Sequence, residues 1–277
     1  MQAKMMQKYG ISPMGIISSL LDHRQLIRAM VKREVLGRYR GSVMGILWSF
    51  LHPVLMLAVY TFVFSVVFKA RWSGGNESKT EFAVVLFAGM IVFSLFAECI
   101  NRAPMMIIAN VNYVKKVVFP LEILPWISLG SALFHLVISL GVWLIFFAAV
   151  NLSVNWTVLL LPLVLFPLMM FTMGLSWFLA ALGVYLRDAA QAVGIVTTIL
   201  MFLSPIFFPV SSLPLEYRPL IYANPLTFII EQARDVLVWG RMPDWPLLGV
   251  YTLAGLIVAS LGFAWFQKTR RGFADVI

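Results

Sequence analysis

Residues 33–68 read REVLGRYRGSVMGILWSFLHPVLMLAVYTFVFSVVF, and they join two segments of opposite character. The segment before residue 46 is basic, with eight Lys and Arg residues in 1–45, whereas residues 46–68 form an apolar run of 23 residues without a charge. A helix needs about 20 apolar residues to cross the hydrocarbon core of a bilayer. Lys and Arg beside a span keep that side in the cytoplasm. The junction therefore predicts a first membrane-spanning helix that follows a cytoplasmic segment.

The composition extends this prediction to the whole chain. Of 277 residues, 61% are hydrophobic and 12% are charged, whereas soluble domains carry roughly 25% charged residues. So much apolar surface excludes a water-soluble fold. The apolar runs do not alternate with polar residues, so we expect an all-α membrane protein rather than a barrel. The net charge of +9 indicates cytoplasmic loops and contact with anionic membrane lipid rather than with nucleic acid.

Six segments are long and apolar enough to span a bilayer. They are residues 46–68, 82–100, 121–150, 156–186, 192–210 and 246–266. With the N-terminus placed in the cytoplasm, the inner segments hold 15 Lys and Arg residues and the outer segments hold 6. This bias predicts six transmembrane helices with both termini cytoplasmic. We expect a cytoplasmic N-terminal segment, 1–45, and one six-span domain, 46–277.

The segment of residues 22–45 has the pattern of an amphipathic helix. Arg24, Arg28 and Lys32 fall on one helical arc, and apolar side chains lie broadly opposite. This pattern predicts a helix that lies in the cytoplasmic membrane interface with its basic ends reaching toward water. The alternative is ordinary flanking charge that only orients the chain.

Glycines recur every four residues at the junction with the first span. They are Gly37, Gly41 and Gly45. We expect them to mark a bend between the interface helix and the span. A smooth helix face for close packing is the other interpretation.

Residues 101–116 predict a cytoplasmic amphipathic helix between the second and third spans. Ile107, Val111 and Val114 share one helical face, and Pro104 suits the first turn of such a helix. The helix would either cover lipid or dock a partner.

Residues 211–245 are longer and more apolar than a plain outer connection. Three prolines divide the segment, and Asn224 followed by Pro225 has the character of an N-cap and a first helical residue. We expect two short re-entrant helices beside a pathway, because irregular backbone at membrane depth is tolerated where it lines a cavity. The alternative is an amphipathic loop on the membrane surface.

Motifs for catalysis are absent from the sequence. No Gly-Lys dipeptide occurs, so the chain has no P-loop, and it has neither a His-Glu-x-x-His nor a Gly-x-Ser-x-Gly motif. We therefore expect no catalytic residue, no metal site and no cofactor in this chain. Glu98 is the deepest acid, and Arg102, four residues on, is placed to pair with it.

Aromatic side chains gather toward the outer ends of two predicted spans. Tyr60 and Phe64 belong to the first span, and Phe207 and Phe208 end the fifth. An aromatic belt at the interface explains most such residues. The alternative is that a subset lines a conduit for sugars.

Several separated strings resemble the membrane subunits of polysaccharide-exporting ABC transporters. They are Arg33-Glu34, Arg38-Tyr39-Arg40-Gly41-Ser42 running into Gly45, Trp48 and Pro53, Val114-Lys115-Lys116-Val117-Val118-Phe119-Pro120-Leu121-Glu122, Tyr185-x-Arg187-Asp188, Ser204-Pro205-Ile206-Phe207-Phe208-Pro209 and Asn224-Pro225-Leu226. In this order they cover nearly the whole chain. The Arg-Tyr-Arg-Gly-Ser form and the short first outer loop look more like the O-antigen branch of the family than its capsule or teichoic acid branches.

The resemblance implies a homodimeric permease in the bacterial inner membrane that exports a lipid-linked polysaccharide. Two separate nucleotide-binding ATPase subunits would hold the ATP and Mg. The ATPase-coupling residues would be Arg102, Ile107, Val111, Val114, Lys115 and Lys116 in a first element and Arg187 and Asp188 in a second. The residues of the channel or of the outer gate helices would be Tyr60, Phe64, Phe207, Phe208, Tyr222, Ile229 and Trp239.

Basic residues near the expected cytoplasmic mouth suggest a site for the pyrophosphate of a lipid carrier, because Arg makes bidentate contacts with phosphate. They are Arg24, Arg28, Arg38 and Arg40. Other functions stay open from the sequence alone: an ABC exporter of a small molecule or drug, an ion-coupled transporter using Glu98 and His52, and a membrane-embedded glycosyl- or acyltransferase.

Overall fold

The computed structural model describes residues 14–67, 72, 79–115 and 119–277, and in these residues the regular structure is helical, with no β-strand. The long helices are α3 (Arg24–Arg38), α4 (Trp48–Tyr60), α5 (Lys79–Arg102), α7 (Leu124–Asn151), α8 (Leu161–Tyr185), α9 (Ala189–Leu203), α11 (Pro225–Arg234) and α12 (Trp245–Thr269). The short ones are α2 (Met14–Asp22), α6 (Val111–Lys115), α10 (Arg218–Tyr222) and α13 (Phe273–Val276). The all-helical prediction is confirmed for this part of the chain.

Five helical stretches within the described residues are long and apolar enough to cross a membrane. They are Gly45–Phe64, Glu81–Met105, Leu121–Asn151, Trp156–Tyr185 and Trp245–Val276. They coincide with the predicted first, second, third, fourth and sixth spans. The chain is therefore a multi-pass membrane protein.

The predicted fifth span, 192–210, is helical only as far as Leu203, because α9 ends there. Ser204 has extended backbone angles (φ −92°, ψ 149°) and precedes Pro205. A residue before proline is disfavoured in the α conformation, so the helix stops after 15 residues. These residues form about 22 Å of helix, at 1.5 Å per residue. A span must cross about 30 Å of hydrocarbon, so α9 alone is too short.

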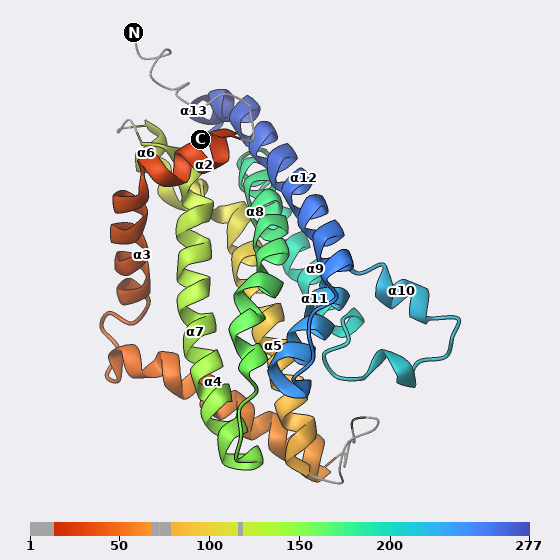
Figure 1. The fold of residues 1–277 in the computed structure, drawn as a ribbon. Coiled ribbons are helices and arrows are strands. Elements are labelled where there is room, and N and C mark those ends of the chain that lie inside the picture. Colours follow the sequence, from red (N-terminus) through yellow and green to blue (C-terminus); the bar gives the residue numbers. More distant parts are fainter. Residues whose placement is uncertain (1–13, 68–71, 73–78, 116–118) are drawn as a thin grey trace.

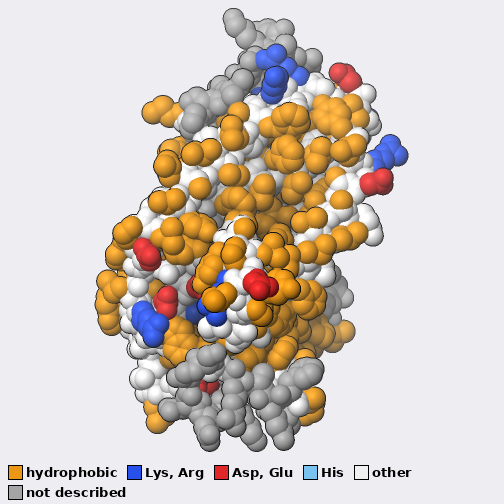
Figure 2. All heavy atoms as spheres, turned by 90° about the vertical axis from the view of Figure 1, so that its right-hand side faces the viewer, with side chains coloured by type: hydrophobic (Ala, Val, Ile, Leu, Met, Phe, Trp, Pro, Cys, Tyr) orange, Lys and Arg blue, Asp and Glu red, His pale blue; other side chains and the backbone are white. Residues whose placement is uncertain are grey.

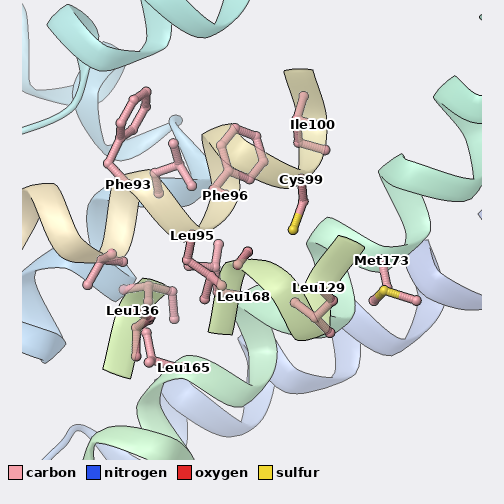
Figure 3. Close-up of a cluster of buried hydrophobic side chains, with 14 of the residues drawn as sticks. Phe93, Leu95, Phe96, Cys99, Ile100, Leu129, Leu136, Leu165, Leu168 and Met173 are labelled. Carbon is pink, nitrogen blue, oxygen red and sulfur yellow. The ribbon is translucent and has the colours of Figure 1, made fainter. Parts of the chain in front are cut away.

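The helix α5 forms the centre of the bundle, since it packs against α7, α8, α9 and α11. Figure 3 shows part of the resulting core, where Leu95 of α5 points toward Leu168 of α8, whereas Phe93 and Phe96 point to the other side of α5. The indole of Trp143 on α7 donates a hydrogen bond to the carbonyl oxygen of Val84 at 2.9 Å. Lipid removes most of the hydrophobic drive between helices, so dense packing and such hydrogen bonds hold them together.

The helices α8 and α12 pack along each other with their backbones in close approach (Figure 1). A Cβ atom on Gly174 or Gly262 would collide with the backbone of the opposite helix. The outward side of α12 is apolar and exposed, and Figure 2 shows a broad apolar surface on this side of the molecule with basic side chains at its upper end. This surface has the character of a lipid-facing side.

The helix α3, predicted to lie in the membrane interface, packs against the bundle. Figure 1 shows α3 beside α7 along its length, and a Cβ on Gly130 of α7 would lie 2.6 Å from Cγ2 of Val31. Its apolar side chains, Ile27, Met30 and Val35, are buried. The predicted bend follows, with positive φ angles at Gly41 (82°) and Gly45 (52°), and α4 then runs obliquely across α7.

Candidate functional site

One end of the bundle carries the C-terminus together with α2, α6 and α13 (Figure 1); we call it the C-terminal end. The carboxylate of Glu122, just before α7, accepts a hydrogen bond from Arg270 at 2.9 Å, and the two side chains are 3% and 10% exposed. The hydroxyl of Tyr185 donates to the carbonyl oxygen of Thr269 at 3.0 Å. These contacts fasten the C-terminal residues onto the ends of α7 and α8.

The first predicted coupling element lies at this end, but the prediction of one continuous helix over 101–116 is wrong. The described residues form two 3₁₀ turns, Ala103–Met105 and Ile108–Asn110, followed by α6. Proline lacks an N–H and clashes with the preceding turn, so α5 ends at Arg102, two residues before Pro104.

The residues predicted on one face of that helix have different surroundings. Ile107 is fully buried, Val111 and Val114 are half-buried, and Lys115 is exposed. Lys116 lies outside the described residues. The buried part packs against α8, where a Cβ on Gly183 would collide with the carbonyl of Pro104.

The second predicted coupling element adjoins the first. Arg187 and Asp188 are exposed in the connection between α8 and α9, which directly follows the stretch of α8 that contacts Pro104. The structure thus brings the two predicted elements together at the C-terminal end.

A row of polar contacts, which we call the α3 ladder, joins α3 to its neighbours. Arg33 donates to the hydroxyl of Tyr113 on α6 at 2.7 Å, and Glu34 forms an ion pair with Arg102. Below them, Arg38 lies 2.6 Å from a carboxylate oxygen of Glu98 on α5. The ladder connects the first coupling element, α3 and α5.

The predicted pairing of Glu98 with Arg102 is present at 3.6 Å, but His135 of α7 is a closer partner that sequence reasoning missed. A ring nitrogen of His135 lies 2.9 Å from the carboxylate of Glu98, and the hydroxyl of Tyr39 lies 3.2 Å from the other ring nitrogen. Only the packing of α5 beside α7 brings these residues together, so no local spacing marks them.

The four arginines assigned to a pyrophosphate site do not share one environment. All four are exposed. Arg38 differs from the others because its guanidinium contacts both Glu98 and His135.

The segment of residues 211–245 contains two helices, as predicted, and Asn224 caps α11 by accepting a hydrogen bond from the Leu226 N–H at 3.0 Å. The helix α11 is buried between α5 and α8, which contradicts the alternative of a loop on the surface for this part. The buried Thr157 donates to the carbonyl oxygen of Val236 at 2.6 Å, in the π-helical turn Asp235–Trp239 that continues α11.

The residues predicted in the outer gate differ in how far their side chains are exposed. Ile229 is buried in α11, Trp239 is half-buried, and Tyr222 of α10 is 56% exposed. A single lining formed by all three is therefore absent from this conformation.

Aromatic rings form a continuous stack toward the end of the bundle opposite the C-terminal end. The ring of Phe64 stacks on Phe82 at 5.5 Å and on Phe207 at 5.7 Å, and Phe207 in turn stacks on Phe202 at 5.7 Å. Tyr60 lies 6.5 Å from Phe64. Phe208, in the same loop as Phe207, is half-buried. The stack joins the first span, α5, α9 and the loop after α9.

A small cavity of about 70 Å³ lies between α4, α5 and α7, and His52, Tyr60, Ser94 and Ser139 supply its polar lining. His52 therefore lines a cavity, whereas the ring that contacts Glu98 is that of His135. Within the described ranges, no three His, Cys, Asp or Glu residues are placed to hold a metal ion.

Comparison with known proteins assigns this architecture to a family. The family model described as ABC-2 type transporter matches residues 25–238. The chain belongs to the ABC-2 type transporter family. The match includes the α3 ladder, both coupling elements and α11.

Individual relatives cover almost the full length of this ABC-2 type transporter. The chain is 28% identical over 264 residues to the O-antigen export system permease protein RfbA of Myxococcus xanthus, covering 95% of this chain and 99% of that relative. It is 24% identical to a protein of the same name from Klebsiella pneumoniae, over 91% of this chain and 95% of the relative. It is also 24% identical to the polysialic acid transport protein KpsM of Escherichia coli, over 87% and 92% of the two chains.

Proposed function

We propose that the chain is the permease subunit of an ABC transporter that exports a lipid-linked polysaccharide, of O-antigen type, across the bacterial inner membrane. The observation that carries this proposal is the similarity to an O-antigen export permease over 95% of this chain and 99% of that relative. A match over both full lengths includes every span and both coupling elements, so it extends beyond a shared fold.

The proposed topology has six crossings and cytoplasmic termini. The excess of Lys and Arg in the predicted inner segments supports this orientation, and α2 and α13 lie at the same end of the bundle. In this topology α9 and the buried α11 together supply the fifth crossing. The proposed assembly is a homodimer of this chain with two ATPase subunits.

The ATPases would dock at the C-terminal end, against residues 102–116 and 187–188. The exposed Lys115, Arg187 and Asp188 offer charged contacts, while the buried Ile107 and Pro104 anchor the element to the bundle. Such an element transmits movement because it is exposed on one side and packed on the other. ATP and Mg would be held by the partner subunits.

The exposed Arg24, Arg28 and Arg40 are proposed to contact the pyrophosphate of the lipid carrier. Arg38 is paired with Glu98, so its proposed role is to hold α3. Replacing Arg24, Arg28 and Arg40 by Gln should reduce export while the protein still inserts and assembles. Export at the wild-type level would reject this assignment.

The proposed function is tested by deleting the chain in its native host and measuring surface polysaccharide, with copurification of a P-loop ATPase as a second measurement. We expect polysaccharide to accumulate inside the deletion strain, and a reintroduced copy of the gene to restore it to the surface. Normal surface polysaccharide together with new sensitivity to small toxic compounds would favour the alternative of a drug exporter. Transport by the purified chain alone under an ion gradient would favour an ion-coupled transporter.

A further inference from the structure

Arg234, at the end of α11, is a buried cation that neither the coupling elements nor the pyrophosphate proposal uses. Its side chain is 3% exposed, and no carboxylate in the described part of the chain lies within ion-pair distance of it. A charge removed from solvent is costly unless other groups satisfy its donors. The contacts that satisfy Arg234 therefore indicate its role.

The guanidinium of Arg234 donates to three backbone carbonyl oxygens on two other segments. Its Nε donates to Val85 of α5 at 3.0 Å. Its Nη1 donates to Pro205 at 2.5 Å and its Nη2 to Ile206 at 3.0 Å, both in the loop that follows α9. One side chain thus joins α11, α5 and this loop.

The loop after α9 needs such donors because α9 ends inside the bundle, where the loop's carbonyl groups are shielded from water. Ser204 is fully buried and extended, so the carbonyl groups that follow it cannot form helical hydrogen bonds. Asn224, at the start of α11, donates to the carbonyl oxygen of Leu203 at 3.3 Å and to the hydroxyl of Ser204 at 2.9 Å. The two ends of α11 therefore hold the first residues of the loop.

Two neighbouring residues, Trp72 and Gly89, surround the guanidinium. The indole ring of Trp72 lies 4.4 Å from its Cζ atom, which is a cation–π contact. On α5, a Cβ added to Gly89 would lie 2.7 Å from Nη2. The absence of a side chain at residue 89 thus provides the space that Nη2 occupies.

The loop held by Arg234 leads directly into the aromatic stack. Phe207 follows Ile206, and its ring stacks on Phe64 of the first span and on Phe202 of α9. Displacement of Ile206 therefore moves a ring that connects the first span to the loop. All three acceptors are neutral carbonyl oxygens. If these hydrogen bonds break, water can accept from the guanidinium in their place, and no buried anion is left unpaired.

We propose that Arg234 is a positioning residue that latches the Ser204–Pro205–Ile206 backbone to α11 and thereby holds Phe207 against Phe64. Release of this latch separates the first span from the loop at the end of the bundle opposite the C-terminal end. This inference rests on the proposed function, because it assigns the latch to the gate of an export pathway.

The test uses the full-length chain in lipid nanodiscs, with Cys99→Ala and Val210→Cys as the background. Val210 is 5% exposed and lies four residues beyond Ile206, so its labelling rate with a maleimide reports opening of the loop. Arg234→Lys and Arg234→Met should each accelerate labelling about tenfold, the factor that corresponds to losing one or more buried hydrogen bonds.

Two further variants separate a latch from a general loss of stability. Gly89→Ala keeps Arg234 but pushes on its Nη2 atom, and Ala is a better helix former than Gly; we expect faster labelling with wild-type assembly. Arg241→Met is the control, because it also removes an arginine from the segment that follows α11, but its side chain is 74% exposed and lies 3.9 Å from Asp235. It should leave labelling of residue 210 unchanged.

Unchanged labelling in Gly89→Ala and in the Arg234 variants would overturn the latch, as would equal acceleration by Arg241→Met. If the Arg234 variants fail to assemble, Gly89→Ala decides the result by itself. The labelling measurement needs no substrate. Failure of the wild-type chain to support polysaccharide export would therefore reject the proposed function separately, without changing the outcome for the latch.

Discussion

The guanidinium of Arg38 on α3 meets the carboxylate of Glu98 on α5 at 2.6 Å, although 60 residues separate them in the sequence. The same carboxylate lies 2.9 Å from His135 on α7. One acid therefore joins the N-terminal helix to two helices of the bundle. The ion pair with Arg38 joins α3 to α5, and the shared carboxylate adds a polar contact to the packing of α3 along α7.

Replacing Glu98 with Gln should destabilise the protein by about 1–3 kcal/mol, since one neutral carbonyl oxygen would replace the two charged oxygens that Arg38 and His135 contact. The measurement is thermal unfolding in nanodiscs. Asp188→Asn is the control, because Asp188 is exposed. The double variant Arg38→Gln/Glu98→Gln should cost less than the sum of its single changes; strict additivity would show that the contact contributes nothing.

Replacing Gly183 with Ala should disturb the C-terminal end, because the new Cβ would collide with the carbonyl of Pro104, a backbone atom that cannot turn away. Overpacking of this kind costs about 1–3 kcal/mol. We expect less ATPase to copurify with the chain. Gly194→Ala on α9 is the matched control, since no atom lies within 4 Å of a Cβ there. Equal ATPase recovery in the two variants would contradict docking at this end.

Charge reversal at the exposed Arg187 should separate ATP hydrolysis from export without preventing membrane insertion. The reason is electrostatic, because this side chain is proposed to contact the ATPase while forming no buried contact in the bundle. Hydrolysis by the purified complex and surface polysaccharide are measured together. Arg241→Glu is the control at the other end of the molecule, where the side chain is 74% exposed. Export that persists in Arg187→Glu would place the coupling contact elsewhere.

Replacing Glu122 with Gln should be more damaging than any of these changes, by about 3–5 kcal/mol, because it strands the nearly buried Arg270. Thermal unfolding provides the measurement. The comparison is Asp235→Asn, whose partner Arg241 lies 3.9 Å away and is exposed, so that pair should contribute no more than about 1 kcal/mol. A similar loss of stability in the two variants would show that burial of an ion pair does not determine how much stability its loss costs.

Apolar length was sufficient to predict α5, α7, α8 and α12, because a run of about 20 apolar residues has few alternatives in a bilayer. The capping of α11 by Asn224 was also predictable, since the donor and the acceptor are two residues apart. The dipeptide Ser204–Pro205 indicates the early end of α9, but the long apolar run around it favoured a continuous span.

Contacts between distant segments were beyond sequence reasoning. The pairing of His135 with Glu98 depends on which face of α5 packs against α7, and the spacing of the two residues in the sequence does not indicate it. The role of Arg234 depends on three carbonyl groups, which every residue possesses. A side chain that binds the backbone of a distant segment therefore leaves no pattern of residue types to detect.

The short α9 has a consequence for how the protein is made. Its 15 residues span about 22 Å, less than the roughly 30 Å of the hydrocarbon core, so this helix is a poor insertion signal when it leaves the ribosome. Leu203 and Ser204 receive their hydrogen bonds from Asn224, which is synthesised 20 residues later than Ser204. In the proposed topology, we therefore expect α9 to settle in the bilayer only after α11 has been synthesised, so that the two helices enter together.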